Sequence, residues 1–192
     1  MPTPSLHLAQ EQAADDLLTS DPLALLMGML LDQQFPLERA FAGPWVLSQR
    51  LPGGRLDVRE IAAFDPDAFA KLMAGPPAVH RYPAAMAGRI QAMCRLVVDD
   101  WDGDAAALWV TAPDGAELLR RVRGLPGFGE QKARIFVALL GKQLGVRPDG
   151  WREAAGPFGE DGSYRSVADV TDADSLGRVR AFKQAAKAAR QT

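Results

Sequence analysis

Residues 125–129, with the sequence LPGFG, are the stretch best suited to bind a charged ligand. The glycines at 127 and 129 allow positive φ angles and close approach of a ligand to the backbone. A helix is predicted to follow at once, and the free N–H groups of its first turn carry the positive end of the helix dipole. Lys132 and Arg134 would add positive charge to this anion site. A DNA phosphate fits such a site, although phosphate contacts position a duplex without reading its sequence.

The same turn also fits a simpler role as a connector between two helices, because glycine turns between helices are common. The charge pattern bears on this choice. The net charge of the whole chain is −2, yet the segment 120–147 holds seven cations and a single acid, Glu130. A second basic run closes the chain, and there the alternative is an ordinary solvated helix face. The cations of the two runs are Arg120, Arg121, Arg123, Lys132, Arg134, Lys142 and Arg147, then Arg178, Arg180, Lys183, Lys187 and Arg190.

Composition narrows the class of protein further. The chain has 192 residues, of which 47% are hydrophobic, so it can bury a substantial core. Its one cysteine, Cys94, excludes an internal disulfide, a four-cysteine iron–sulfur cluster and a thiolate zinc site, and two histidines make a histidine-rich metal site unexpected. No apolar run is long enough to span a membrane and the first residues lack a signal pattern, so we expect a cytoplasmic protein with no membrane contact.

Helical periodicity extends through nearly the whole sequence, and no segment alternates with the period of a strand. Asp21 and Asp65, each followed by proline, are expected to cap helices, and Thr171 or Asp172 the last one. Gly43–Pro44 is expected to interrupt the second helix. The predicted helices cover residues 22–34, 37–51, 58–64, 66–73, 84–100, one or two segments within 103–124, a helix from 130, and 171–190.

Two segments carry a resemblance to a known superfamily. The segment 125–141, LPGFGEQKARIFVALLG, resembles the helix-hairpin-helix of the base-excision DNA glycosylases that include endonuclease III and the bacterial alkylpurine glycosylases. The segment 24–43, ALLMGMLLDQQFPLERAFAG, resembles their early helix, which ends in a glutamine-bearing loop. The resemblance covers about residues 21–149. It implies an all-α, helix-hairpin-helix glycosylase-like fold in which two lobes flank a cleft, formed by one domain over residues 1–192 with a core of about 21–150 and the last helix on the N-terminal lobe.

The superfamily flips a damaged base out of the duplex into a pocket and fills the gap with a wedge side chain. By position, Gln34 resembles that wedge, with Gln33 beside it; the alternative is a polar pair at the end of a helix. The resemblance also implies double-stranded DNA as the partner of a monomer, and room for a monovalent cation at the hairpin. The single cysteine, Cys94, excludes an iron–sulfur cluster. The hairpin residues that would contact DNA are Gly127, Phe128, Gly129, Gln131, Lys132 and Arg134.

Two positions govern the expected chemistry. Bifunctional members carry a lysine two residues after the second hairpin glycine, and this chain has Gln131 there, which cannot form a Schiff base. Their catalytic aspartate stands about eighteen residues later, and Asp149 lies eighteen residues after Gln131. A carboxylate there would stabilise the cationic sugar of the transition state. The setting, Pro-Asp-Gly, fits an ordinary turn equally well. Glu153 and Glu38 are the fallback carboxylates.

The segment 79–83, VHRYP, lies where glycosylases line the pocket or contact the partner strand. His80, Arg81 and Tyr82 offer stacking and phosphate contacts there, against the alternative of a plain surface loop. Trp151, two residues after Asp149, is a candidate for the pocket wall. The first hypothesis is therefore a monofunctional DNA N-glycosylase, near the nucleoid if the cell is prokaryotic. The second is a DNA-binding protein without catalysis, and the third a helical interaction module unrelated to DNA.

Overall fold

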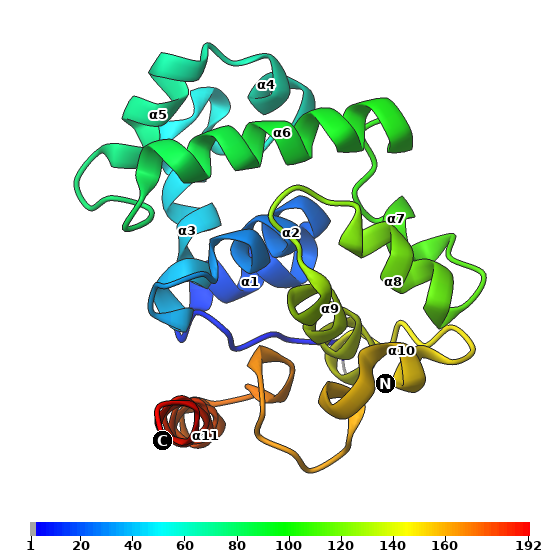
Figure 1. Ribbon diagram of the computed structural model, residues 1–192. Helices are drawn as coiled ribbons and strands as arrows, with labels where there is room; N and C mark the ends of the chain where they lie inside the picture. The colour runs from blue at the N-terminus through cyan, green and yellow to red at the C-terminus, as the bar shows by residue number, and fades with distance from the viewer. Residues whose placement is uncertain (1–2) are drawn as a thin grey trace.

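The computed structural model describes residues 3–192, and regular structure within them is helical (Figure 1). Three 3-10 turns, η1 (Pro52–Gly54), η2 (Gly156–Gly159) and η3 (Val167–Asp169), accompany the α-helices. The α-helices are α1 (Gln12–Ser20), α2 (Pro22–Leu31), α3 (Leu37–Arg50), α4 (Val58–Ala63), α5 (Pro66–Ala74), α6 (Pro83–Trp101), α7 (Ala107–Val110), α8 (Gly115–Arg123), α9 (Glu130–Gln143), α10 (Trp151–Ala155) and α11 (Ala173–Arg190).

The predicted helix starts are confirmed where an acidic cap precedes the helix. The Asp21 carboxylate accepts hydrogen bonds from two N–H groups of the first turn of α2, at 2.9 and 3.4 Å. Asp65 caps α5, and Asp172 caps α11 in a reciprocal pair with Ser175. The predicted interruption near Pro44 is wrong, because α3 continues through it and buries this residue in the core. Helix α1 was not predicted.

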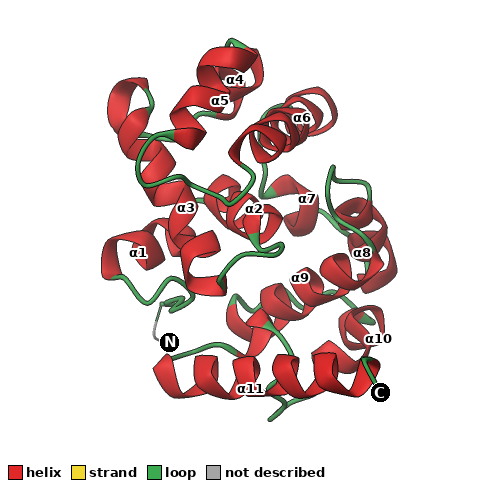
Figure 2. Ribbon diagram, turned by 60° about the vertical axis from the view of Figure 1, so that its left-hand side comes forward, coloured by secondary structure: helices red, strands yellow, loops and turns green. Residues whose placement is uncertain are grey.

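Helix α2 is the centre of the fold. All its residues from Leu23 to Leu31 are buried, so the helix is apolar on every side and has neighbours all around it. Helices α4, α5 and α6 pack together on one side of it and α8, α9 and α10 on the other (Figure 1). The hydrophobic core runs through both groups without a break. The elements after α10 lie farthest from α4–α6, with α11 along the outer edge in both views (Figures 1 and 2).

The structure confirms an all-α protein within residues 3–192. The one strand-like feature there is an isolated bridge between Asp114 and Asp149, which joins the start of α8 to the turn before α10. No helix in this described part of the chain has the length and apolar character needed to cross a membrane.

Candidate functional site

A cavity of about 870 Å³ lies between three parts of the chain that are far apart in sequence, and we call it the central cavity. The loop after α2 forms one wall, the first turns of α9 form the second, and the C-terminal half of α11 forms the third, with residues near η2 and η3 between them. Its lining residues are Met29, Asp32, Gln33, Gln34, Phe35, Gln131, Lys132, Ile135, Pro157, Phe158, Arg165, Phe182, Lys183, Ala186, Lys187 and Arg190.

The glutamine loop, residues 32–36, is fixed from the side of α6 by a buried histidine. His80 is 1% exposed, and its Nε2 lies 3.0 Å from the main-chain oxygen of Gln33. Its Nδ1 accepts a hydrogen bond from the Tyr82 N–H, so Nε2 carries the proton and donates to Gln33. Burial lowers the pKa of His80, which favours this neutral form. Arg89 donates to the side-chain oxygen of Gln33 at 2.7 Å. Both histidine and arginine therefore hold Gln33 in place.

Gln34 differs from its neighbour, because no hydrogen bond holds its side chain within residues 3–192. Gln34 is exposed, and its φ of 52° lies in the left-handed region that residues other than glycine rarely adopt. It lines the central cavity and two smaller hollows beside it. Non-glycine residues in this conformation concentrate at functional sites. The backbone therefore places Gln34 at the edge of the central cavity, where its side chain is free to contact a ligand.

Lys132 crosses from α9 to the end of α2. Its Nζ donates to the main-chain oxygens of Met29 and Leu30, at 2.9 and 3.2 Å, and so satisfies carbonyls that the end of a helix leaves unpaired. Burial lowers the pKa of Lys132 to about 8. The sequence led us to expect that Lys132 faces a phosphate outside the protein. In the structure its ammonium group donates to α2, and Lys132 is one of the residues that line the central cavity.

Asp32 follows α2 directly and is the acid of the central cavity. Its N–H bonds to Gly28, whereas no group within residues 3–192 donates a hydrogen bond to its carboxylate. Burial raises the pKa of Asp32 above its usual range, and the nearby charge of Glu38 acts in the same direction. The positive charges of Lys183 and Lys132 oppose these effects. The cavity is thus lined by a carboxylate without a hydrogen-bond donor in the described residues, together with Lys132 and Lys183, a combination that sequence reasoning missed.

The third wall comes from the closing basic run. Phe182, Lys183, Ala186, Lys187 and Arg190 are spaced so that they share one face of α11, and all of them line the central cavity. The C-terminal half of this helix is otherwise exposed, and Phe182 retains 43% of its accessible surface. Three cations of the closing basic run, Lys183, Lys187 and Arg190, therefore line the cavity while they remain exposed to solvent.

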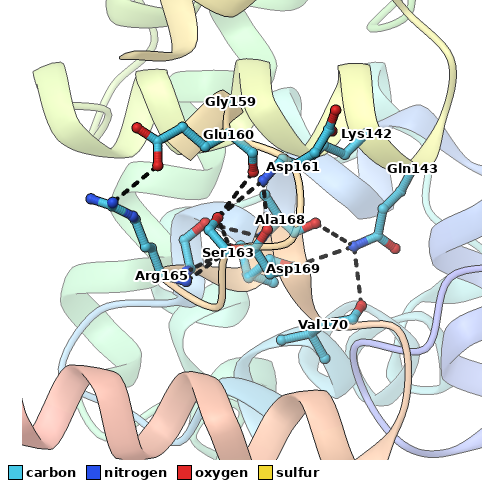
Figure 3. Close-up of polar contacts among 12 residues, drawn as sticks. Lys142, Gln143, Gly159, Glu160, Asp161, Ser163, Arg165, Ala168, Asp169 and Val170 are labelled. Atoms are coloured by element: carbon cyan, nitrogen blue, oxygen red, sulfur yellow. Dashed lines mark hydrogen bonds and ion pairs between the residues drawn. The ribbon is translucent and has the colours of Figure 1, made fainter. Parts of the chain in front are cut away.

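The segment between α10 and α11 is fastened to α9 by a buried ion pair (Figure 3). The Lys142 Nζ lies 2.6 Å from a carboxylate oxygen of Asp169, and their side chains are 11% and 5% exposed. The second oxygen of Asp169 accepts the Arg165 N–H at 2.8 Å, and Gln143 donates to three carbonyls of the same segment. These bonds place the Arg165 side chain at the central cavity.

The two hairpin glycines have different surroundings. Gly127 has a φ of 81°, and a Cβ there would lie 2.5 Å from a methyl carbon of Leu30, so the turn packs directly on α2. Phe128 is buried and contacts Phe136 edge-on, which makes it a core residue. Gly129 has an ordinary φ of −80°, and a Cβ there would meet nothing within 4 Å. Packing therefore explains the glycine at 127 but not the glycine at 129.

Asp149 does not belong to the residues that line the central cavity. It is exposed at a separate hollow of about 370 Å³, which Glu153 and Arg134 also line. Its main-chain oxygen accepts the Gly115 N–H at 2.7 Å, and a Cβ on Gly115 would lie 2.5 Å from the oxygen of Gly150. The Pro-Asp-Gly turn thus has a structural role, in which it closes on the start of α8.

The remaining candidates are spread over different surroundings. Arg134 pairs with Glu130 and donates to the Ala154 oxygen, so its guanidinium serves the packing of α10 on α9. Trp151 is buried against Gly141, away from the central cavity. Arg81 and Tyr82 are exposed beside the glutamine loop.

Glu38 is paired with Arg180 of α11, while its second oxygen is buried without a partner in the described part of the chain. Of the candidates from the sequence, the structure brings together Gln33, Gln34, Gln131 and Lys132. In comparisons with known protein families and with curated proteins, the chain has no significant match.

Proposed function

We propose that this chain is a double-stranded-DNA-binding protein of base-excision repair, a monofunctional DNA N-glycosylase that flips a damaged or mismatched base and hydrolyses its N-glycosidic bond. One observation carries the proposal: the glutamine loop, the first turns of α9 and the basic face of α11 meet at one cavity of about 870 Å³. That volume falls in the range of small-molecule sites, which is roughly 300–1,000 Å³, and it suits a flipped nucleotide.

The lining chemistry supports a nucleotide as the ligand. Apolar and aromatic side chains, among them Phe35, Phe158 and Phe182, offer surfaces on which a base can stack. Cations outnumber acids in the lining, where Asp32 is the single acid and the cations are Lys132, Arg165, Lys183, Lys187 and Arg190. Such a wall attracts a phosphate backbone even though the net charge of the chain is −2.

Lys132 lies in the first turn of α9, directly after the hairpin turn, and its bonds to the end of α2 join this turn to the helix that leads into the loop with Gln34. In this proposal, the N–H groups at the start of α9 bind a phosphate, and Gln34 enters the duplex where the base has left. The exposed Arg81 and Tyr82 beside the loop would meet the partner strand. Gln131 lines the cavity with an amide, so no lysine nucleophile stands at that position. The protein would act as a monomer where the DNA lies, in the cytoplasm.

A second candidate function is DNA binding without catalysis. The location of Asp149 favours it, because the carboxylate expected from the resemblance lies at another hollow and its turn has a structural role. Both functions share the DNA-binding surface and differ only in whether a base is released.

The test measures binding and base release together. Duplexes with uracil, 8-oxoguanine, alkylated adenine or an abasic site are incubated with the protein, and free base is quantified after separation. The glycosylase proposal expects salt-sensitive binding and release of one of these bases. Binding without release of any base supports the second candidate, and neither binding nor release at low salt contradicts both.

A further inference from the structure

The central cavity is lined by a carboxylate, Asp32, which is its candidate for a catalytic group. Asp32 lines the cavity directly after α2, and no protein group within residues 3–192 donates a hydrogen bond to its side-chain oxygens. The Asp32 oxygens are accessible at the cavity, since the one side-chain atom that is buried without a partner in the described residues is Glu38 Oε2. An accessible carboxylate that no protein group binds, beside a large cavity, is a candidate for a role with a ligand.

Opposing effects act on the ionisation of Asp32, and burial, the largest of them, raises its pKa. Lys132 lies on the α9 side and Lys183 on the α11 side, and both favour the ionised form, while Glu38 of α3 and burial oppose it. Lys132 donates to two main-chain oxygens of α2, and it forms no ion pair with Asp32 in the described residues. The carboxylate is left free to interact with a positive centre inside the cavity.

We infer that Asp32, and not Asp149, is the catalytic carboxylate of this chain, and that it acts on the cationic sugar formed when the glycosidic bond breaks. The inference depends on the proposed glycosylase function. When the C1′–N bond breaks, the departing base takes the electron pair and C1′ becomes cationic; Asp32 stabilises that charge. The oxygen of a water molecule then bonds to C1′, Asp32 accepts the proton of that water, and the proton passes to the departed base. The products are the free base and an abasic sugar with a hydroxyl at C1′.

Lys132 is a positioning residue in this scheme. Its Nζ ties the end of α2, and therefore the backbone that carries Asp32, to the first turn of α9. Its charge also favours the ionised form of the carboxylate. Both effects act through Asp32, so a change at Lys132 should alter the pH dependence of the reaction as well as its rate.

The test uses two duplexes that need no knowledge of the lesion. One carries a neutral tetrahydrofuran abasic analogue, and the other carries a pyrrolidine analogue whose ring nitrogen is cationic. Hydrogen bonds with a charged partner contribute about 1.5–3 kcal/mol, so the wild type should prefer the pyrrolidine duplex by about tenfold or more. Asp32→Asn should lose this preference and keep its affinity for the tetrahydrofuran duplex, which also shows that the variant is folded.

Asp149→Asn is the matched control, because it removes an exposed carboxylate of the same type at the other hollow. It should retain the preference for the pyrrolidine duplex. Loss of the preference in Asp149→Asn, its survival in Asp32→Asn, or equal binding of both duplexes by the wild type would each overturn the assignment while leaving DNA binding in place. Failure of the wild type to bind any duplex would instead contradict the proposed function, and the assignment with it.

Discussion

The two hairpin glycines allow the packing role and the ligand role of the turn to be separated. Gly127→Ala should destabilise the protein, because it forces a side chain into a φ of 81° and places a Cβ 2.5 Å from Leu30. The left-handed conformation lowers the free energy of unfolding by about 1–2 kcal/mol, and overpacking lowers it by about 1–3 kcal/mol. Alanine also restricts the unfolded chain, which raises the free energy of unfolding by ~0.5 kcal/mol. The net loss of about 1.5–4.5 kcal/mol corresponds to a fall in melting temperature of roughly 3–18 °C for a chain of this size.

Gly129→Asp should have the opposite profile. Gly129 is the N-cap of α9, with an extended conformation and free space around it, so aspartate there caps the helix and complements its dipole. The melting temperature should stay the same or rise. DNA affinity should fall by about fivefold or more, because two negative charges near a protein surface repel each other by about 1–4 kcal/mol.

Thermal unfolding and fluorescence-anisotropy titration of a labelled duplex at 0.1 M salt measure the two effects. Gly54→Asp, at an exposed φ-positive glycine after α3, adds the same charge in an open turn and should change affinity by less than about twofold, because screening weakens distant charges. Wild-type affinity in Gly129→Asp would show that the turn is only a connector. Wild-type stability in Gly127→Ala would refute the packing on Leu30.

Three further results are expected. Base release should have a bell-shaped dependence on pH. It should fall in acid as Asp32, whose pKa is raised, becomes protonated, and fall above about pH 8 as Lys132 loses the charge with which it binds the end of α2, so that Lys132→Arg moves the alkaline limb upward. A flat profile between pH 5 and 9 would contradict this. Borohydride should trap no covalent adduct, since Gln131 is an amide and the Lys132 ammonium donates to two carbonyls; an adduct would assign a nucleophilic lysine. Asp169→Ala should lower the unfolding free energy by about 3–5 kcal/mol in denaturant titration, because it leaves Lys142 buried without its partner; a loss under ~1 kcal/mol would mean that the pair is solvated.

Local signals predicted most helix boundaries, because the residues that cap a helix act through bonds within a few positions. Asp21 and Asp172 are examples, and each accepts the bonds expected of an N-cap. Pro44 was misjudged since local preference disfavours proline within a helix. Here the neighbouring Phe41 and Leu47 are fully buried, and their tertiary packing keeps α3 continuous. Such packing depends on partners elsewhere in the chain, which local patterns do not contain.

The candidate site was predicted in part for the same reason. The glutamine loop and the start of α9 each carry a sequence pattern, and the fold brings Gln34 and Gln131 to one cavity. Asp32 was missed because an acid after a helix is ordinary until Lys132, a hundred residues later, is placed beside it. The role of Lys187 was left open between ligand binding and a solvated helix face, because the sequence does not show which distant residues lie near an exposed charge. In both cases the sequence did not show which distant elements line the same cavity.

Release of a free base from duplex DNA tests the central claim most directly. Purified protein is incubated with the panel of lesion-bearing duplexes near pH 7, and the liberated base is quantified by chromatography, with Asp32→Asn in parallel. We predict that the wild type releases one of the bases, leaving an abasic site that breaks only in hot alkali, and that Asp32→Asn releases at least about tenfold less. Binding of every duplex without release of any base would contradict the claim that this chain is a glycosylase.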